Sequence, residues 1–237
     1  MKKSKRLQEI FRKNMEFERQ SPYNFCDQWC ERCVYEKQIR CKVYLDELEQ
    51  KMVCIAHDRE PGDPEITEAV LRKQLEDAGE KLEQFAEENE IDLDNIDDPE
   101  FEKIREHIKF VENNPLLATV EQYRKKGQSF LKNTFYNQQE IKGGLTDDFE
   151  TVAWYHTLLP VKLQRALAGF HEPAAEGDIS IYDAVAQFEI CKKAINRSVS
   201  ALQNIAKKDK SLHNRIMQLL AILRNIFSRI DLMESEI

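Results

Sequence analysis

Four cysteines lie within sixteen residues near the start of the chain, and their spacing could support metal chemistry. They follow the pattern C-x3-C-x2-C-x7-C at Cys26, Cys30, Cys33 and Cys41. Thiolates bind both zinc and iron–sulfur clusters, and four of them complete the ligand shell of one centre. In a reducing compartment, cysteines grouped this closely indicate metal binding rather than disulfides. We therefore expect one metal centre in residues 26–41, with these four cysteines as its ligands.

The composition of the segment favours one metal but leaves a second open. Structural zinc sites usually pair two C-x2-C units, often with glycine at the tight turns. This segment has a single C-x2-C and no glycine, and its apolar neighbours include Phe25, Trp29 and Val34. A compact quartet among apolar residues suits a shielded cluster. We expect a [4Fe–4S] cluster rather than Zn²⁺, with zinc as the alternative.

The segment TVAWYHTLLPVKLQRALAG is a second candidate site. His156 precedes Pro160, and Lys162 and Arg165 form an i, i+3 cationic pair beyond it. Proline lacks a backbone N–H and crowds the previous turn, so we expect this helix to kink or break. An imidazole and two cations at a kink could bind an anionic ligand. The structural alternative is that the aromatic residues pack, His156 finds a backbone partner and the cations are solvated.

Two short segments carry a resemblance to known sequences. CDQWCERC…RC and WYHTLLPVKLQRAL are similar to an uncharacterised bacterial protein family with a CDxWCERC-type four-cysteine segment and a WYH…K…RAL helix. The resemblance implies no activity. It implies that five helix residues accompany the cysteines, namely Trp154, Tyr155, His156, Lys162 and Arg165.

One part of the cysteine pattern resembles a different class. Cys26, Cys30 and Cys33 match the C-x3-C-x2-C spacing of radical S-adenosylmethionine enzymes. In those enzymes the three cysteines leave one iron open for the cofactor and follow a strand of a β/α barrel. A fourth thiol at Cys41 and the lack of alternating strand and helix patterns disfavour this class.

The rest of the chain predicts an all-α fold that holds these residues. Glycine is scarce, charged residues make up 33%, and runs of β-branched residues bounded by turns are hard to find. Helix starts are marked by a capping residue followed by proline at Asp63-Pro64, Asp98-Pro99 and Asn114-Pro115. We expect a bundle of about seven or eight helices, with Gly169 ending the helix that contains Pro160.

The helices are expected to form one domain over residues 1–237, with the cysteine segment attached to it. The acidic loop 87–98 is a weak candidate for a boundary. Apolar residues recur at helical spacing from Leu212 to Met233, which predicts a core-facing final helix. Cys191 lies in a similar apolar stripe and is expected to be buried packing.

Charge and hydropathy exclude several classes of partner. Residues 58–102 carry 18 acidic and 4 basic side chains, and an acidic region repels phosphate backbones. Nucleic-acid binding is therefore disfavoured. No apolar run is long enough to span a membrane, and the basic start lacks the apolar core of a signal peptide, so we expect a cytoplasmic protein. A protein partner or self-association is the expected mode of interaction.

Three functions remain open from the sequence. The first is a structural or regulatory protein that holds one metal centre. The second is an enzyme that uses an exposed redox cluster, or that acts on an anionic ligand near His156, Lys162 and Arg165. The third is a metal-free helical interaction module.

Overall fold

The fold is all-α, as the sequence predicts. The computed structural model describes residues 4–88, 99–137, 144–172 and 179–237, and no β-strand occurs within these ranges. They contain nine α-helices, one more than the upper expectation, because residues 35–38 form a separate one-turn helix.

Eight longer helices form the body of the structure, and short helical turns connect some of them. The longer helices are α1 (Lys5–Gln20), α3 (Lys42–Ala56), α4 (Pro64–Glu88), α5 (Pro99–Glu112), α6 (Pro115–Leu131), α7 (Thr146–His171), α8 (Ile179–Lys208) and α9 (His213–Ser235). The short elements are η1 (Pro22–Phe25), η2 (Cys30–Arg32), α2 (Tyr35–Gln38), the π-helical turn η3 (Lys132–Tyr136) and η4 (Lys210–Leu212).

The chain divides into two compact units. The bundle unit comprises Met1–Gln20, Asn24–Trp29 and Glu106–Ile237, and the hairpin unit comprises Ser21–Tyr23 and Cys30–Arg105. The division falls inside α5. Most of the acidic loop expected as a boundary, residues 89–98, lies outside the described residues.

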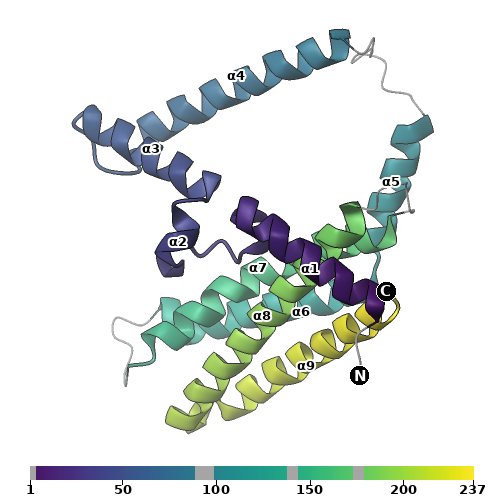
Figure 1. The fold of residues 1–237 in the computed structure, drawn as a ribbon. Helices are drawn as coiled ribbons and strands as arrows, with labels where there is room; N and C mark the ends of the chain where they lie inside the picture. Colours follow the sequence, from purple (N-terminus) through teal and green to yellow (C-terminus); the bar gives the residue numbers. More distant parts are fainter. Residues whose placement is uncertain (1–3, 89–98, 138–143, 173–178) are drawn as a thin grey trace. The chain divides into compact units, whose positions relative to one another are not determined.

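In the bundle unit, four helices surround a common core. Helix α6 packs against α7 and α9, and α8 packs against the same two helices, while α1 lies on the outer side of α8 (Figure 1). Each helix contributes an apolar stripe to the core, as amphipathic periodicity requires. The largest fully buried side chains include Tyr123, Phe130, Tyr155, Leu163 and Phe188.

Polar caps start several helices where the sequence predicts them. The Asn114 side chain accepts a hydrogen bond from the backbone N–H of Leu116 at 2.9 Å. Asp63 Oδ1 accepts from the N–H of Glu65 at 2.9 Å. Each side chain satisfies a donor that the first helical turn leaves unpaired. The predicted starts of α6 and α4 are therefore confirmed.

Gly169 has a different role from the one expected. Helix α7 continues through it to His171, so the prediction that Gly169 ends the helix is wrong. A Cβ atom at Gly169 would lie 2.6 Å from the carbonyl oxygen of Ser180 on α8, closer than non-bonded atoms approach. The glycine is required because two helix backbones meet there.

Pro160 does not break α7. The helix runs without interruption from Thr146 to His171 with the proline inside it. The missing N–H of Pro160 leaves the carbonyl of His156 without its usual helical donor. The flanking Leu159 and Leu163 are buried in the core, so packing holds the helix together across the proline.

In the hairpin unit, α3 and α4 are joined by a turn with two left-handed residues, Asp58 (φ 57°) and Gly62 (φ 89°). The spacing of Val43, Tyr44, Leu48, Met52 and Ile55 in the sequence predicts that they face inward, and for all of them except the half-buried Tyr44 this prediction is wrong. Several apolar side chains of α3 and α4 are exposed: Val43, Leu48, Met52, Ile55, Leu71, Leu75, Leu82 and Phe85.

No helix within the described ranges combines the length and apolarity needed to cross a membrane.

Candidate metal centre

Asp27, the residue after the first cysteine, is a buried carboxylate with three polar partners in the bundle unit. It is 8% exposed. Its Oδ2 atom accepts hydrogen bonds from the Tyr155 hydroxyl at 2.7 Å and from Arg197 at 3.1 Å, and it lies 3.1 Å from Lys193 Nζ. Arg197 also donates to the Tyr155 hydroxyl at 2.6 Å. We call Asp27, Tyr155, Lys193 and Arg197 the Asp27 cluster.

The electrostatics of the cluster keep the carboxylate ionised. Burial raises the pKa of Asp27, but the Tyr155 hydrogen bond and the charges of Lys193 and Arg197 outweigh it and hold the pKa below its usual value. Burial and the adjacent carboxylate raise the pKa of Tyr155, so its hydroxyl stays protonated and donates. The cluster is therefore a charged network in which Asp27 is the sole anion among its members.

Two tryptophans fix the same segment to α7. The rings of Trp29 and Trp154 stack with centroids 5.2 Å apart and planes 18° from parallel. Trp154 Nε1 donates to the backbone carbonyl of Asp27 at 2.9 Å. Trp29 also meets the edge of Tyr155 at a centroid distance of 5.9 Å. These contacts hold the backbone beside Cys26 in one place.

Cys26 shares its surroundings with a buried lysine. Lys162 on α7 is 4% exposed, and the described residues give its ammonium no hydrogen bond or ion pair. Burial lowers the pKa of Lys162, while the nearby thiols of Cys26 and Cys191 favour its charged form. Burial raises the pKa of Cys191, which is fully buried as the sequence predicts. A buried cation therefore lies near the first cysteine of the quartet.

The other three cysteines belong to the hairpin unit, where local hydrogen bonds shape their segment. The N–H of Cys33 donates to the carbonyl of Cys30 at 3.1 Å, closing the turn η2. Gln38 Nε2 donates to the same carbonyl at 2.9 Å, and the N–H of Cys41 donates to the Gln38 carbonyl at 3.0 Å. Gln38 thus connects the backbone at Cys30 to the backbone at Cys41.

Three of the six cysteines, Cys41, Cys54 and Cys191, are buried, and the other three are half-buried. None of the six forms a disulfide. Within the part of the chain that the structure describes, no group of three or more His, Cys, Asp or Glu side chains is arranged to hold a metal ion.

His156 and Lys162 face different sides of α7. His156 Nδ1 lies 2.7 Å from the Ala153 carbonyl and Nε2 lies 2.8 Å from Gln128 Oε1 on α6. It also packs against Gly127, where an added Cβ would come within 3.2 Å of it. Burial lowers the pKa of His156 below its ordinary value. The imidazole thus has the backbone partner that the structural alternative required.

Arg165 forms an ion pair within the bundle. Its Nε and Nη2 atoms donate to the two carboxylate oxygens of Asp183 on α8, each at 2.7 Å. Gln187 bonds to the same carboxylate and to the carbonyl of Asn24. The structure therefore brings Lys162 and Arg165 to one side of α7, next to the segment that carries Cys26, without His156.

Sequence reasoning selected Tyr155 and missed the other three members of the Asp27 cluster. Asp27 lies between two cysteines, a position that invites attention to the thiols alone. Lys193 and Arg197 are spaced i, i+4 on α8, a pattern typical of a solvated helix face. In the structure, about half of each side chain is exposed. A carboxylate inside a cysteine segment was the available signal.

Comparison of the chain with protein-family models, with curated proteins and with solved structures found no match.

Proposed function

We propose that the protein binds one metal centre through Cys26, Cys30, Cys33 and Cys41, in a structural or regulatory role that involves a protein partner or self-association. The donor set fits either metal, since four thiols are what a [4Fe–4S] cluster or a structural zinc ion takes. The apolar neighbours and the lack of glycine in the segment favour the cluster.

The observation that carries the proposal is the buried side chain of Lys162, whose charge lies near Cys26. A charge inside a protein costs several kcal/mol unless an opposite charge accompanies it. An ordinary thiol is neutral at pH 7 and supplies no such charge. Four cysteines bound to zinc or to a cluster are thiolates, and they leave the centre with a net negative charge. A metal centre would therefore explain why a lysine is buried there.

The Asp27 cluster supports the same proposal. A metal centre needs ligands held in place by the residues around them. Hydrogen bonds from Tyr155, Trp154 and Arg197 fix the residue next to Cys26 on the bundle unit.

The test is metal analysis and visible absorption of the full chain purified without oxygen. A cluster predicts brown protein with iron and sulfide, whose visible absorption is bleached by dithionite. Zinc predicts about one equivalent per chain and no colour. Protein that contains neither metal after anaerobic purification and after reconstitution would refute the proposal.

Two variants make the test specific. Cys30→Ser/Cys33→Ser removes two ligands and is expected to abolish metal binding. Cys191→Ala removes a buried thiol outside the quartet and is expected to keep the metal at full stoichiometry. Equal metal content in the two variants would mean that the quartet is not the site.

A metal-free interaction module is the second candidate, and two observations favour it. The described cysteines form no ready metal group, and α3 and α4 expose a row of apolar side chains such as Met52 and Leu75. Exposed apolar surface marks protein interaction sites. Metal-free protein that keeps its thermal stability on addition of a chelator would favour this function. The anionic-ligand enzyme has less support, because His156 faces away from Lys162 and Arg165 is paired with Asp183.

A further inference from the structure

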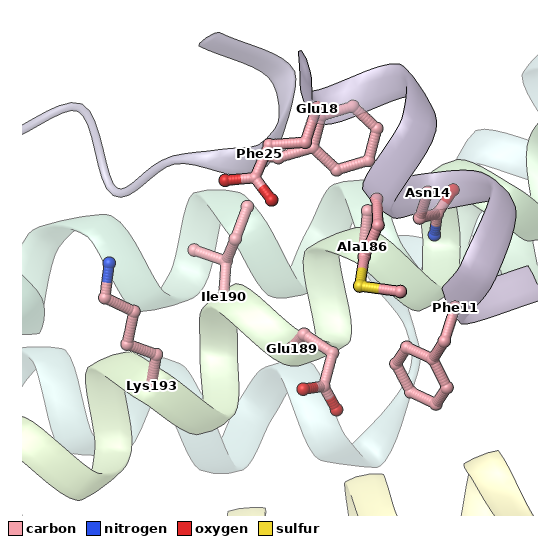
Figure 2. Close-up of a pocket in the computed structure, with 9 residues that line it drawn as sticks. Phe11, Asn14, Glu18, Phe25, Ala186, Glu189, Ile190 and Lys193 are labelled. Atoms are coloured by element: carbon pink, nitrogen blue, oxygen red, sulfur yellow. The ribbon is translucent and has the colours of Figure 1, made fainter. Parts of the chain in front are cut away.

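The bundle unit has a groove of about 290 Å³ between α1 and α8, and Figure 2 shows the side chains that line it. This volume is at the lower end of the range for small-molecule sites and is too small for a helix of a partner protein. Lys193 Nζ lies 3.1 Å from Asp27 Oδ2, and Glu189 lies 2.7 Å from Lys192 Nζ. With these charges matched, the groove favours no particular class of charged ligand.

Helix α4 in the hairpin unit carries an apolar stripe on its exposed surface. Its members follow one another at steps of four and three residues: Leu71, Leu75, Ala78, Leu82 and Phe85. The four large side chains among them are each more than half exposed. At about 1.5 Å per residue, the stripe is about 21 Å long. We call it the α4 stripe.

The spacing of the α4 stripe determines the shape of a partner that can cover it. Alternating steps of three and four residues keep apolar side chains along one line of a helix. A second helix packs on such a line by placing its own side chains between them. Contiguous exposed apolar residues mark interaction sites, and an amphipathic helix lying on an apolar surface is a common mode of recognition. The stripe therefore fits a helix with apolar residues at the same spacing.

Negative charge is concentrated in the same part of α4. Between Leu75 and Glu88 the helix carries six carboxylates and one ammonium, that of Lys81. The six carboxylates are those of Glu76, Asp77, Glu80, Glu83, Glu87 and Glu88. None of the six forms an ion pair within the described part of the chain. This negative charge is therefore left for a cation from outside the helix to balance.

The dipole of α4 adds to this negative charge. The last turn of α4 has no basic residue, whereas α8 ends with Lys207 and Lys208. The C-terminus of a helix carries a partial negative charge, so carboxylates there are unfavourable and a nearby cation is favourable. A cationic partner would relieve the repulsion between Glu87 and Glu88, whereas an anionic partner would increase it.

Charge therefore distinguishes among the helices that fit the α4 stripe. The α4 helix of a second copy would place the same carboxylates opposite one another, which repulsion between like charges disfavours. Helix α3 also exposes apolar residues, such as Leu48 and Met52. Its two lysines nearly balance its three carboxylates, so α3 has no comparable charge with which to select a partner.

We propose that the α4 stripe binds a basic amphipathic helix of another protein. Apolar side chains of that helix pack between Leu75, Leu82 and Phe85, and its lysines or arginines lie beside the carboxylates of α4. The inference rests on the proposed function only in that this function involves a protein partner, and it names the chemistry of the partner. No cysteine takes part in the contact.

The test is the fluorescence anisotropy of a labelled helical peptide titrated with the full chain. The probe has three heptads, with leucine at positions a and d and lysine at e and g. A matched probe has glutamate at e and g. We expect saturable binding of the lysine probe at low salt and binding of the glutamate probe that is weaker by about tenfold or more. Equal affinities, or no saturable binding of the lysine probe, would overturn the proposal.

A pair of variants assigns the binding to the stripe. Leu75→Ser/Leu82→Ser removes two apolar contacts without changing the charge and should weaken binding of the lysine probe about tenfold or more. Both side chains are exposed, so the variant keeps the fold. Met217→Ser/Leu232→Ser removes two exposed apolar side chains of α9 and, as the matched control, should bind as the wild type does. Unchanged affinity in the α4 variant would show that the probe binds elsewhere and that the proposal is wrong.

The contribution of charge has its own variant. Glu76→Gln/Glu83→Gln should weaken binding of the lysine probe several-fold at low salt and by less at high salt, because salt screens exposed charges. An affinity that is the same as that of the wild type at low salt would contradict the proposed role of the carboxylates.

Sedimentation velocity of the wild type tests whether a second copy covers the stripe. We expect a monomer. A dimer that Leu75→Ser/Leu82→Ser converts to monomers would mean that α4 binds its own chain, which would overturn the proposal. None of these readouts involves metal, so failure here is distinguishable from failure of the metal centre.

Discussion

At the scale of single residues, Asp27 combines burial with partners from distant parts of the chain. Tyr155 is 128 residues away and Arg197 is 170 residues away, so their hydrogen bonds to Asp27 form only when the bundle unit is folded. The carboxylate therefore couples residues 24–29 to α7 and α8 within the bundle unit.

We expect Asp27→Asn to lower the free energy of unfolding by about 1–3 kcal/mol, because two cations and a hydroxyl lose their anion. Half of each cation side chain is exposed, which keeps the effect below that of a fully buried pair. Since the folded pKa of Asp27 lies below the unfolded value, its contribution is complete above the unfolded pKa and is lost as the pH falls through the folded pKa. Urea unfolding of wild type and variant between pH 7 and pH 3 measures this, and the difference should shrink toward pH 3. Asp77 lies on the exposed face of α4, so Asp77→Asn should change neither the free energy of unfolding nor its dependence on pH.

The pKa of His156 predicts that the free energy of unfolding also depends on pH in a second, higher pH range. Its folded pKa lies below the ordinary value of 6.5, so the folded state holds the imidazole neutral while the unfolded state takes up a proton below that pH. Stability should therefore fall as the pH drops below 6.5, by at most about 1.4 kcal/mol per pH unit. His156→Gln should reduce this slope in unfolding titrations between pH 7.5 and pH 5.5. A slope identical to that of the wild type would mean that His156 is protonated in the folded state.

The sequence identified some of these residues and missed others for a physical reason. The cysteine quartet and the WYH helix could be selected because their residue types and spacing are unusual along the chain. Arg197 and Lys193 could not, because their importance depends on Asp27 lying across from them in the folded protein. Contacts at such long separation leave no periodic pattern in the sequence.

At the scale of helices, the close approach of α7 and α8 depends on Gly169. We expect Gly169→Ala to destabilise the protein by about 1–3 kcal/mol, because the new methyl group would meet the Ser180 carbonyl at 2.6 Å and the helices would have to move apart. Thermal unfolding measures the effect.

Gly79 provides the matched control in another helix. An added Cβ at Gly79 in α4 meets nothing within 4 Å. Alanine is the better helix former by up to about 1 kcal/mol, so Gly79→Ala should raise helical stability rather than lower it. A gain in stability in both variants would show that helix propensity and not the α7–α8 contact governs the response to Gly169→Ala.

Helix positions could be predicted well where local signals determine them. Capping at Asn114 marked the start of α6, and the apolar stripe from Leu212 to Met233 marked the extent of α9. The burial of α3 could not be predicted, because amphipathic spacing indicates a face that can be buried and not whether another element covers it. The continuation of α7 through Pro160 likewise depends on tertiary packing, which outweighs the low helix propensity of proline.

At the scale of the whole molecule, the two units differ in how much of each helix is buried. Helices α7 and α8 bury many side chains, whereas α3 buries only Cys54 and α4 only Ala86 among the described residues. Local unfolding is easier where few apolar contacts must be broken. We therefore expect amide hydrogen exchange of α3 and α4 to be faster than that of α7 and α8 by several orders of magnitude. Mass spectrometry of peptides from each helix measures this, and equal protection would mean that α3 and α4 are covered in solution.

The fold class could be predicted from the composition and from the start signals of the helices. The division of the molecule into units could not. The absence of strand patterns and the regular helix starts were sufficient for an all-α prediction. The division cuts α5 between Arg105 and Glu106, in the middle of an uninterrupted helix. A boundary inside regular secondary structure carries none of the glycine, proline or linker composition by which boundaries are recognised in sequence.

The stack of Trp29 on Trp154 gives the protein an optical signal of its own. These are the two tryptophans of the chain, and they lie face to face. Two indoles this close couple their excited states, and the coupling gives paired bands of opposite sign in the circular dichroism spectrum. The pair of bands should vanish when residues 26–29 leave α7, even if every helix remains intact. Attachment of residues 26–29 to α7 can thus be followed spectroscopically, without a label and independently of the helical content.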